Sequence, residues 1–311
     1  MAPSLDDTTT TEMAINTIQT ATAPKTKAKT RSSPHGKENL TALQAISQGT
    51  TLPGIPSFTS IEKQRHWMLE HMAGAFRVFA RKGYTEGMAG HISVRDPGDP
   101  TTFWTNPLGR HFGLLRASDM ILVNSSGHPI GGNLSRPANA AGFLIHAAVH
   151  KARPDVHAAC HTHSPYGRAW SAFGAPLEML NQDVTYFYGS AQAVYNDFGG
   201  IVFSEEEGER LAGALGPKGK GLILKNHGLL TVGGTVDEAA YLFTLMERSC
   251  EVQLRVEAAA AGGKYKKCLV GEEEAAYTFK MASDPETLYW EFQPDLEYEH
   301  ETSGGIYADL K

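Results

Sequence analysis

Helix-like and strand-like segments alternate through most of this chain, and this alternation limits its fold more than any other feature. Capping-box spacing at Thr59 and at Thr235 predicts the starts of two helices. Apolar residues recur every three or four positions after Thr59, as they do along one face of a helix. Short apolar runs bounded by glycine and proline predict strands between the helices. Such alternation is typical of an α/β protein built in layers.

The predicted elements cover residues 59 to 262. Helices are expected at residues 59–83, 137–153, 165–173, 204–216 and 235–261, and strands at 91–95, 103–105, 120–123, 156–163 and 221–230, the last with a turn at Asn226 to Gly228. We therefore expect one folded domain over residues 58–263.

The two ends of the chain differ in composition from its middle. Residues 1–57 are rich in threonine and poor in large apolar residues, so we predict a disordered tail there. Residues 264–311 carry an excess of acids but keep five aromatic residues between positions 277 and 292. Because disordered segments hold few aromatics, we expect this acidic extension to dock in part on the domain or on a neighbouring subunit.

Composition excludes several classes of protein. With 34 acidic and 28 basic residues the net charge is −6, whereas a dedicated nucleic-acid binder has a basic excess. Three cysteines provide no disulfide framework and suit a reducing compartment. No apolar run approaches the ~20 residues that span a bilayer. We therefore expect a cytoplasmic protein with no nucleic-acid or membrane partner.

Three of the 13 histidines form a pattern that is typical of a metal site. His161 and His163 alternate along a predicted strand, so their side chains point to the same face. His227 follows a second strand-like run. Two ligands close in sequence and one distant ligand often hold a catalytic zinc, which leaves a coordination position for water or substrate. Two polar residues at the end of a strand would give the same His-x-His pattern without a metal.

Five motifs in order resemble the class II aldolase/adducin family. They are Gly-His-Ile-Ser-Val-Arg at 90–95, Leu-Val at 122–123 with Ser-Gly at 126–127, His-Thr-His-Ser-Pro at 161–165, Phe-Gly-Gly-Ile at 198–201 with Glu-Glu-Gly at 206–208, and Lys-Asn-His-Gly-Leu at 225–229. The resemblance covers about residues 60–262. It implies a three-layer α/β/α sandwich around a central mixed sheet, and a homo-oligomer, by analogy a tetramer.

The resemblance also implies roles for individual residues. His161, His163 and His227 match the family's three metal-binding histidines. We expect a divalent metal there, Zn²⁺ first, with Mn²⁺, Fe²⁺ and Co²⁺ as alternatives. Aldolase members carry a glutamate in the helix before the His-x-His strand, where it serves as a further ligand and as acid/base. That position here is Gly142. Their phosphate-contacting serines correspond to Ala140 and Ala141, and the Ala-Gly-Phe pattern resembles the adducin branch. A sugar phosphate is therefore not the expected substrate.

Four other residues are predicted to act on a small-molecule substrate. Asp183, in a loop, is the candidate for proton transfer, although a turn or capping role explains it equally well. His91 is a candidate to contact substrate at the mouth of the site, with a structural role in its loop as the alternative. Arg110 and His111 are candidates to bind an anionic group, unless they are simply solvated.

Three more polar residues near the site are assigned to structure. His146 and His150 lie one helical turn apart, where they are expected to pack or form hydrogen bonds. Cys160 precedes His161 in the strand and should face the opposite side, in the core.

The leading hypothesis is a metal-dependent, aldolase-like lyase that acts on a small carbonyl or carboxylate compound. A non-haem iron oxygenase or decarboxylase is one alternative, because three histidines also suit iron. A non-catalytic, adducin-like binding module is the other.

Overall fold

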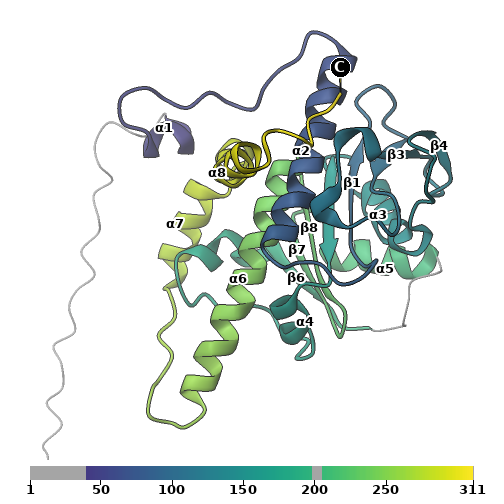
Figure 1. Cartoon of the computed structure of the whole chain (residues 1–311). Helices are drawn as coiled ribbons and strands as arrows, with labels where there is room; N and C mark the ends of the chain where they lie inside the picture. The colour runs from purple at the N-terminus through teal and green to yellow at the C-terminus, as the bar shows by residue number, and fades with distance from the viewer. Residues whose placement is uncertain (1–39, 198–204, 311) are drawn as a thin grey trace, which may run out of the picture. The chain divides into compact units, whose positions relative to one another are not determined.

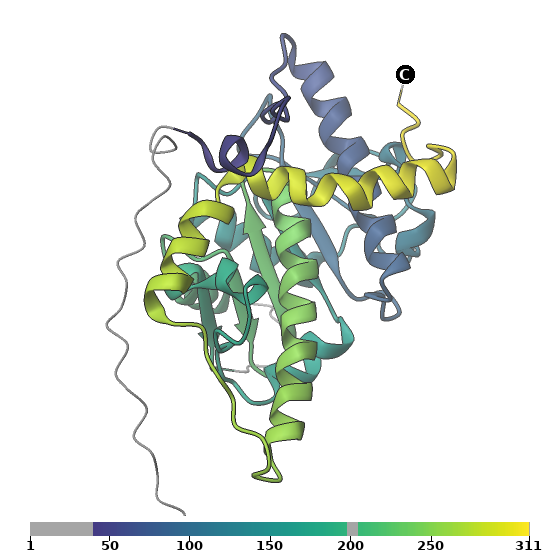
Figure 2. The same cartoon turned by 90° about the vertical axis from the view of Figure 1, so that its left-hand side faces the viewer.

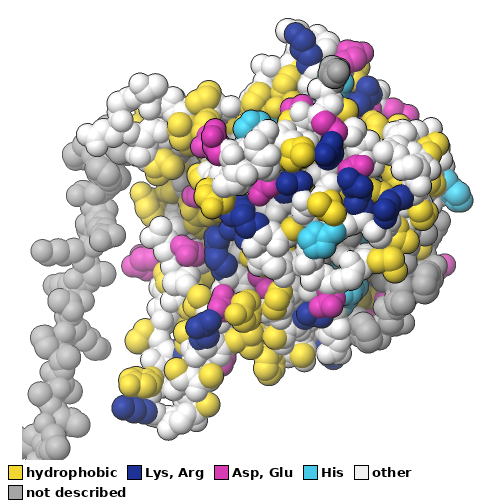
Figure 3. Space-filling view, viewed as in Figure 1, with side chains coloured by type: hydrophobic (Ala, Val, Ile, Leu, Met, Phe, Trp, Pro, Cys, Tyr) yellow, Lys and Arg dark blue, Asp and Glu magenta, His cyan; other side chains and the backbone are white. Residues whose placement is uncertain are grey.

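The computed structural model describes residues 40–197 and 205–310 (Figure 1). Residues 1–39, the larger part of the predicted tail, lie outside this range, as does the Phe-Gly-Gly-Ile motif at 198–201. Among the helices that the structure describes, none combines the length and apolar character needed to cross a membrane. Basic and acidic side chains are interspersed over the face shown in Figure 3.

One mixed sheet forms the centre of the protein, in the order β4-β3-β2-β1-β5-β8-β7-β6. The strands are β1 (His91–Arg95), β2 (Phe103–Thr105), β3 (Ile121–Val123), β4 (Pro129–Gly132), β5 (Ala158–Thr162), β6 (Gln192–Tyr195), β7 (Gly221–Leu224) and β8 (Gly228–Gly233). Only β6 and β7 pair in parallel among these strands. The edge strands β4 and β6 were not predicted. Both are short and lack a clear apolar alternation, and β4 is largely exposed whereas β6 is half-buried.

Helices cover both faces of the sheet (Figure 1). They are α1 (Ala42–Ile46), α2 (Ile61–Arg81), α3 (Ala140–Ala152), α4 (Pro165–Ser171), α5 (Glu205–Leu215), α6 (Val236–Ala260), α7 (Glu272–Ala282) and α8 (Pro285–Ser303). Short 3₁₀ helices lie at η1 (Phe112–Leu114), η2 (Ala117–Asp119), η3 (Asp183–Phe187) and η4 (Gly189–Ala191). The predicted three-layer α/β/α sandwich is confirmed.

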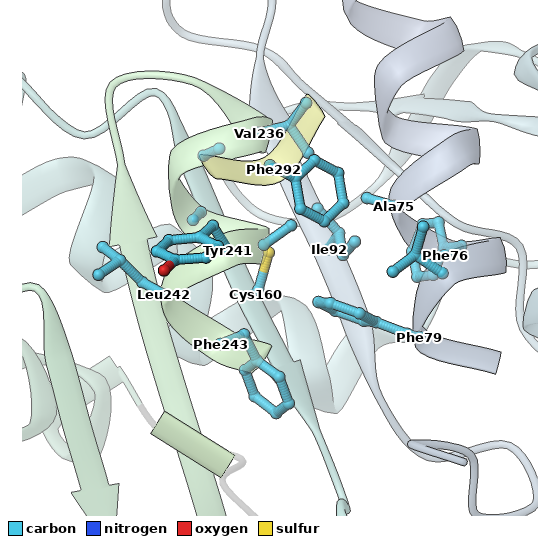
Figure 4. Packing of buried hydrophobic residues seen from close by; sticks show 14 of the residues in the cluster. Ala75, Phe76, Phe79, Ile92, Cys160, Val236, Tyr241, Leu242, Phe243 and Phe292 are labelled. Carbon is cyan, nitrogen blue, oxygen red and sulfur yellow. The ribbon is translucent and has the colours of Figure 1, made fainter. Parts of the chain in front are cut away.

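The two faces of the sheet bury separate apolar clusters. On one face α2, α6 and α8 pack around residues such as Phe79, Cys160 and Phe292, all fully buried (Figure 4). On the other face α3 and α5 cover a smaller cluster that includes Val149 and Leu230. Cys160 therefore lies in the core, as its place in the strand predicts.

Both ends of the described chain pack against the helical layer. α8 crosses α6 and α2 (Figure 2), and its Leu288 and Phe292 are fully buried. Residues 40–57 belong to the predicted tail, yet they include α1, which begins with a capping box between Thr41 and Gln44. The indole of Trp290 donates a hydrogen bond to the Pro53 carbonyl. These contacts are local, and an amino-acid composition averaged over 57 residues does not show them.

The register of the central strands sets the position of the site. β1 and β5 are adjacent, with His91 opposite His161. β5 pairs on its other side with β8, with His161 opposite Leu230. β8 is joined to β7 by a tight turn in which Asn226 has φ 58°, a left-handed conformation that asparagine tolerates. The predicted run 221–230 is thus two antiparallel strands, and His227 lies in the turn between them.

Candidate metal centre

The three predicted ligands come together at one end of the central strands. His161 lies in β5, His163 is the first residue after that strand, and His227 lies in the turn between β7 and β8. One nitrogen from each imidazole can be chosen so that all three lie within 4.8 Å of one another. We call these residues the metal-site histidines.

The donor geometry fits a divalent metal. The Nε2 atoms of His163 and His227 are 3.1 Å apart. Two nitrogens bound to one tetrahedral zinc at about 2.05 Å would be roughly 3.3 Å apart. The Nδ1 of His161 lies 2.8 Å from the carbonyl oxygen of Leu229 and donates to it, which leaves Nε2 without a proton. The three side chains therefore offer imidazole nitrogens to a single point.

Burial keeps these imidazoles in the form that binds metals. Loss of solvent lowers the pKa of His161 and of His163, and lowers the pKa of His227 to about 4. Mutual repulsion acts in the same direction for His161 and His227. Near neutral pH the rings are uncharged, and neutral imidazole is the metal-binding species.

A buried carboxylate holds the backbone that follows His163. Glu247, in α6, accepts hydrogen bonds from the backbone N–H groups of Tyr166 and Gly167, at 2.7 and 2.6 Å, and from the Ser164 hydroxyl. It thereby satisfies free N–H groups at the start of α4. Burial raises the pKa of this carboxyl in spite of these hydrogen bonds. Glu247 was not predicted from the sequence, although an acidic residue within a mostly apolar stretch of a long predicted helix was a signal for it.

His91 lies beside the metal-site histidines, and its position explains the glycine at 142. The His91 ring centroid is 5.1 Å from that of His161. A Cβ atom on Gly142 would lie only 2.3 Å from Cδ2 and Nε2 of His91. Any side chain at position 142 would therefore collide with this imidazole. The space next to the metal-site histidines on this side is filled by His91.

Behind His91 lies a second histidine group that is closed to solvent. The Ser93 hydroxyl is 2.7 Å from Nδ1 of His146 and 2.7 Å from Nε2 of His150. The Nδ1 of His150 is 3.1 Å from the Val156 carbonyl oxygen. We call Ser93, His146 and His150 the buried histidine network. Both histidines form hydrogen bonds, as predicted for them.

The structure shows other contacts for the remaining predicted site residues. Arg110 pairs with Asp119 at 3.0 Å, and the Nδ1 of His111 accepts the backbone N–H of Gly113. Asp183 is exposed at the start of η3, which packs against α6 and α7. Within residues 40–197 and 205–310, no side-chain hydrogen bond or ion pair joins Asp183, Arg110 or His111 to the metal-site histidines. Their roles toward a substrate stay predictions.

Comparisons with known proteins identify the family of this chain. Residues 70–254 match the model of the class II aldolase and adducin N-terminal domain. The chain is 46% identical over 252 residues to the meiotically up-regulated gene 14 protein of Schizosaccharomyces pombe. This match covers 81% of this chain and 96% of that protein. It is 43% identical over 206 residues to the decarboxylase NovR of Streptomyces niveus, covering 66% of this chain and 75% of the other.

The solved structure of an L-fuculose 1-phosphate aldolase from Glaciozyma antarctica is similar to this chain in fold and in part of its sequence. The match has a TM-score of 0.74 and 40% identity, and covers 81% of this chain and 96% of that one.

Proposed function

Because the chain belongs to the family of class II aldolases and adducins, we propose that it is a metal-dependent lyase acting on a small carbonyl or carboxylate compound. The observation that carries the proposal is the convergence of three neutral imidazoles on one point. Three protein ligands leave coordination positions for a substrate, as in catalytic rather than structural metal sites. Zn²⁺ is the first candidate, with Mn²⁺, Fe²⁺ and Co²⁺ as alternatives.

In this proposal His161, His163 and His227 would hold the metal. When bound, a divalent ion supplies a Lewis acid that polarises a carbonyl oxygen or stabilises an enediolate. His91 lines the site and would orient the substrate. Arg110 and His111 would bind an anionic group only after Arg110 releases Asp119.

Decarboxylation is favoured over aldol cleavage by the residues around His91. Aldol cleavage needs a base to take the hydroxyl proton and an acid to return one to the enediolate. Position 142 provides no such group, and His91 fills the space that a carboxylate there would need. The similarity to the decarboxylase NovR supports this choice. Asp183 is still our candidate for proton transfer, and its exposure would let it act at a contact between subunits.

We further propose that the protein forms a homo-oligomer, by family analogy a tetramer. Tyr277 and Tyr298 on the C-terminal helices are 63% and 56% exposed, and tyrosine is enriched at interfaces. Light scattering that detects only the 33.7 kDa chain would contradict this proposal.

The function is tested with the full chain loaded in turn with Zn²⁺, Mn²⁺, Fe²⁺ and Co²⁺. The substrates are fuculose and rhamnulose phosphates beside unphosphorylated hydroxy-ketones and keto acids. We expect turnover of unphosphorylated compounds alone. Ordinary turnover of a sugar phosphate would show that another group replaces a carboxylate at 142. Activity with Fe²⁺ that also consumes O₂ would identify an oxygenase. Failure of every metal to bind would favour an adducin-like binding module.

A further inference from the structure

Arg168 is a charged side chain beside the metal-site histidines, in the short helix α4. The backbone of α4 is held at both ends. At its start, the N–H of Gly167 donates to the buried carboxylate of Glu247, at 2.6 Å. At its end, the carbonyl of Ser171 accepts the N–H of Asn226, in the β7–β8 turn, at 3.1 Å. Arg168 therefore lies on a segment that is fixed against the turn that carries one ligand and follows directly after another.

The stem of the Arg168 side chain lies close to the first of these ligands. A Cβ atom on Gly228 would lie 4.0 Å from Cγ of Arg168 and 3.9 Å from Cε1 of His161, so these two atoms are less than 8 Å apart. Cε1 is bonded to Nε2, the nitrogen of His161 that is left for a metal. The electrostatics of the site agree with this placement. Burial lowers the pKa of His163, the charge of Arg168 lowers it further, and the charge of Glu86 raises it.

In the structure Arg168 already binds a carboxylate, that of Glu86. Nη2 of Arg168 is 3.0 Å from Oε2 of Glu86, and the side chains are 42% and 54% exposed. Glu86 begins a tight turn before β1, in which its carbonyl accepts the N–H of Ala89. Ion pairs as exposed as this one contribute little to stability. A carboxylate from solvent can therefore replace Glu86 on the guanidinium with little loss of free energy.

From this arrangement, and resting on the proposed function for the metal that completes the site, we propose that Arg168 binds the carboxylate of the substrate and that Glu86 occupies its place in the free protein. A guanidinium offers a planar fork of N–H donors that matches the two oxygens of a carboxylate. A phosphate dianion is disfavoured, because the displaced Glu86 stays nearby and repels two charges rather than one. The substrate class is thereby narrowed to carboxylic acids whose carbonyl or hydroxyl oxygen faces the metal-site histidines.

Arg110, the other candidate for binding an anionic group, is held more firmly. Its partner Asp119 is only 15% exposed, compared with 54% for Glu86. The guanidinium of Arg110 also donates to the carbonyl of Leu114, at 3.0 Å. An incoming carboxylate would have to displace both partners, so Arg168 is the more available of the two cations.

The first experiment needs no metal. Full-length, metal-free protein is titrated with glycolate and with its neutral analogue glycolamide, and broadening of their methylene proton signals in NMR measures binding. We expect glycolate to bind more tightly than glycolamide. Arg168→Gln should weaken glycolate binding by about 10-fold, because charge-assisted hydrogen bonds are lost. Arg168→Lys, which keeps the charge without the fork, should lie between the two.

Removal of the competing carboxylate should act in the opposite direction. Glu86→Gln releases the guanidinium and should tighten glycolate binding by about 2- to 5-fold. Loss of a negative charge alone would favour any anion, so the double variant Glu86→Gln with Arg168→Gln is the control, in which this gain should disappear. Glu209→Gln breaks another exposed ion pair, with Lys151, and should change nothing.

Three results of these titrations would overturn the proposal. The first is equal binding of the two probes, or binding of neither, by wild-type protein and by Glu86→Gln. The second is glycolate binding that Arg168→Gln leaves unchanged. The third is an equal gain from Glu86→Gln with and without Arg168.

Co²⁺-loaded protein separates this proposal from the proposed function. Glycolate should change the visible absorption of the bound Co²⁺, and Arg168→Gln should keep its Co²⁺ but need about 10-fold more glycolate. Failure of the wild type to bind Co²⁺ would count against the proposed function, while the metal-free titrations would still decide the role of Arg168. Loss of Co²⁺ by Arg168→Gln would show that this residue supports the metal site instead. Inorganic phosphate that binds through Arg168 more tightly than glycolate would replace the carboxylate with a phosphate group and overturn the assigned class.

Discussion

The metal-site histidines and the buried histidine network lie on either side of His91. The two groups differ in what their imidazole nitrogens face. The second group is fully buried, whereas in the first His161 is buried and His163 and His227 are partly buried; in both groups burial lowers the pKa of the rings. In the first group nitrogens from three side chains point at one another. In the second, a serine hydroxyl and a backbone carbonyl take up three of the four nitrogens.

The difference shows what separates a binding site from a core made of the same residue type. Neutral imidazole is common to both groups, so burial alone does not identify a ligand. The distinguishing feature is whether the lone pairs converge on empty space or on donors within the protein. For His146 and His150 the partner is Ser93, whereas Nε2 of His163 lies 3.1 Å from Nε2 of His227, and two imidazole nitrogens at this distance can share either a proton or a metal ion.

The largest expected effect is loss of metal when ligands are removed from the first group. His161→Ala combined with His163→Ala should lower affinity for Zn²⁺ by more than about 100-fold, since even outer-shell changes cost 10- to 100-fold. Mass spectrometry of the purified proteins measures the bound metal. His128→Ala, at an exposed histidine, is the matched control and should keep its metal. Wild-type protein free of metal after mild purification, or a double variant that retains it, would disprove the assignment.

A methyl group added at Gly142, in α3, tests the packing around His91, which lies between the two groups. Gly142→Ala would place a Cβ atom 2.3 Å from the His91 ring, so we expect a loss of about 1–3 kcal/mol in the free energy of unfolding. Gly213→Ala is the matched control, because its Cβ would meet nothing within 4 Å, and it should stabilise the helix by about 0.4–1 kcal/mol. Urea denaturation measures both.

A double variant tests whether His91 is the cause of that loss. Adding His91→Ala to Gly142→Ala removes the ring that the new methyl group meets. The combined loss should then be smaller than the sum of the two single losses. Simple additivity would show that position 142 is restricted by something other than His91.

Whether a feature of the fold or of the candidate site could be predicted from the sequence depends on how far apart along the chain its contacting residues lie. Helical periodicity predicted α2 and the cap at Thr235 predicted α6, and the alternation of His161 and His163 predicted their common face, because these patterns lie within a few residues. The cap of α2 is Ser60 rather than the predicted Thr59. The contact between His91 and Gly142 requires α3 to pack over β1. The bond from Ser164 to Glu247 spans 83 residues. No local pattern specifies such pairs, so two roles stayed open for His91 and the contacts of Glu247 were not predicted.

The pH dependence of stability offers a further contrast within the buried histidine network. Burial, aided by repulsion from Arg95, lowers the pKa of His150 from 6.5 to about 3. The unfolded chain therefore binds a proton below pH 6.5 that the folded protein does not, so stability falls as the pH drops from 6.5 toward 3. Between pH 7 and pH 5 this single group accounts for about 2 kcal/mol.

The variant His150→Gln removes the contribution of His150 to the pH dependence of stability. Its free energy of unfolding should fall by about 2 kcal/mol less than that of the wild type over the same pH interval. Urea denaturation at both pH values gives the comparison, and Gly213→Ala, which keeps every histidine, should follow the wild type. Parallel curves for wild type and His150→Gln would mean that His150 is already protonated, or exposed, in the folded protein.

The smallest expected effect concerns Phe103, whose ring packs against the buried histidine network. The Phe103 ring stacks on His150, with centroids 4.6 Å apart and an angle of 25° between the planes, and the Arg95 guanidinium lies 5.2 Å from the Phe103 centroid. Phe103→Leu keeps an apolar side chain but removes both contacts. We expect a loss of about 1 kcal/mol in the free energy of unfolding. Metal content should not change, because Phe103 contacts the network and not the ligands. Were Phe103→Leu to lose metal in proportion to stability, the two histidine groups would have to be treated as one cooperative site rather than as a binding centre and its separate support.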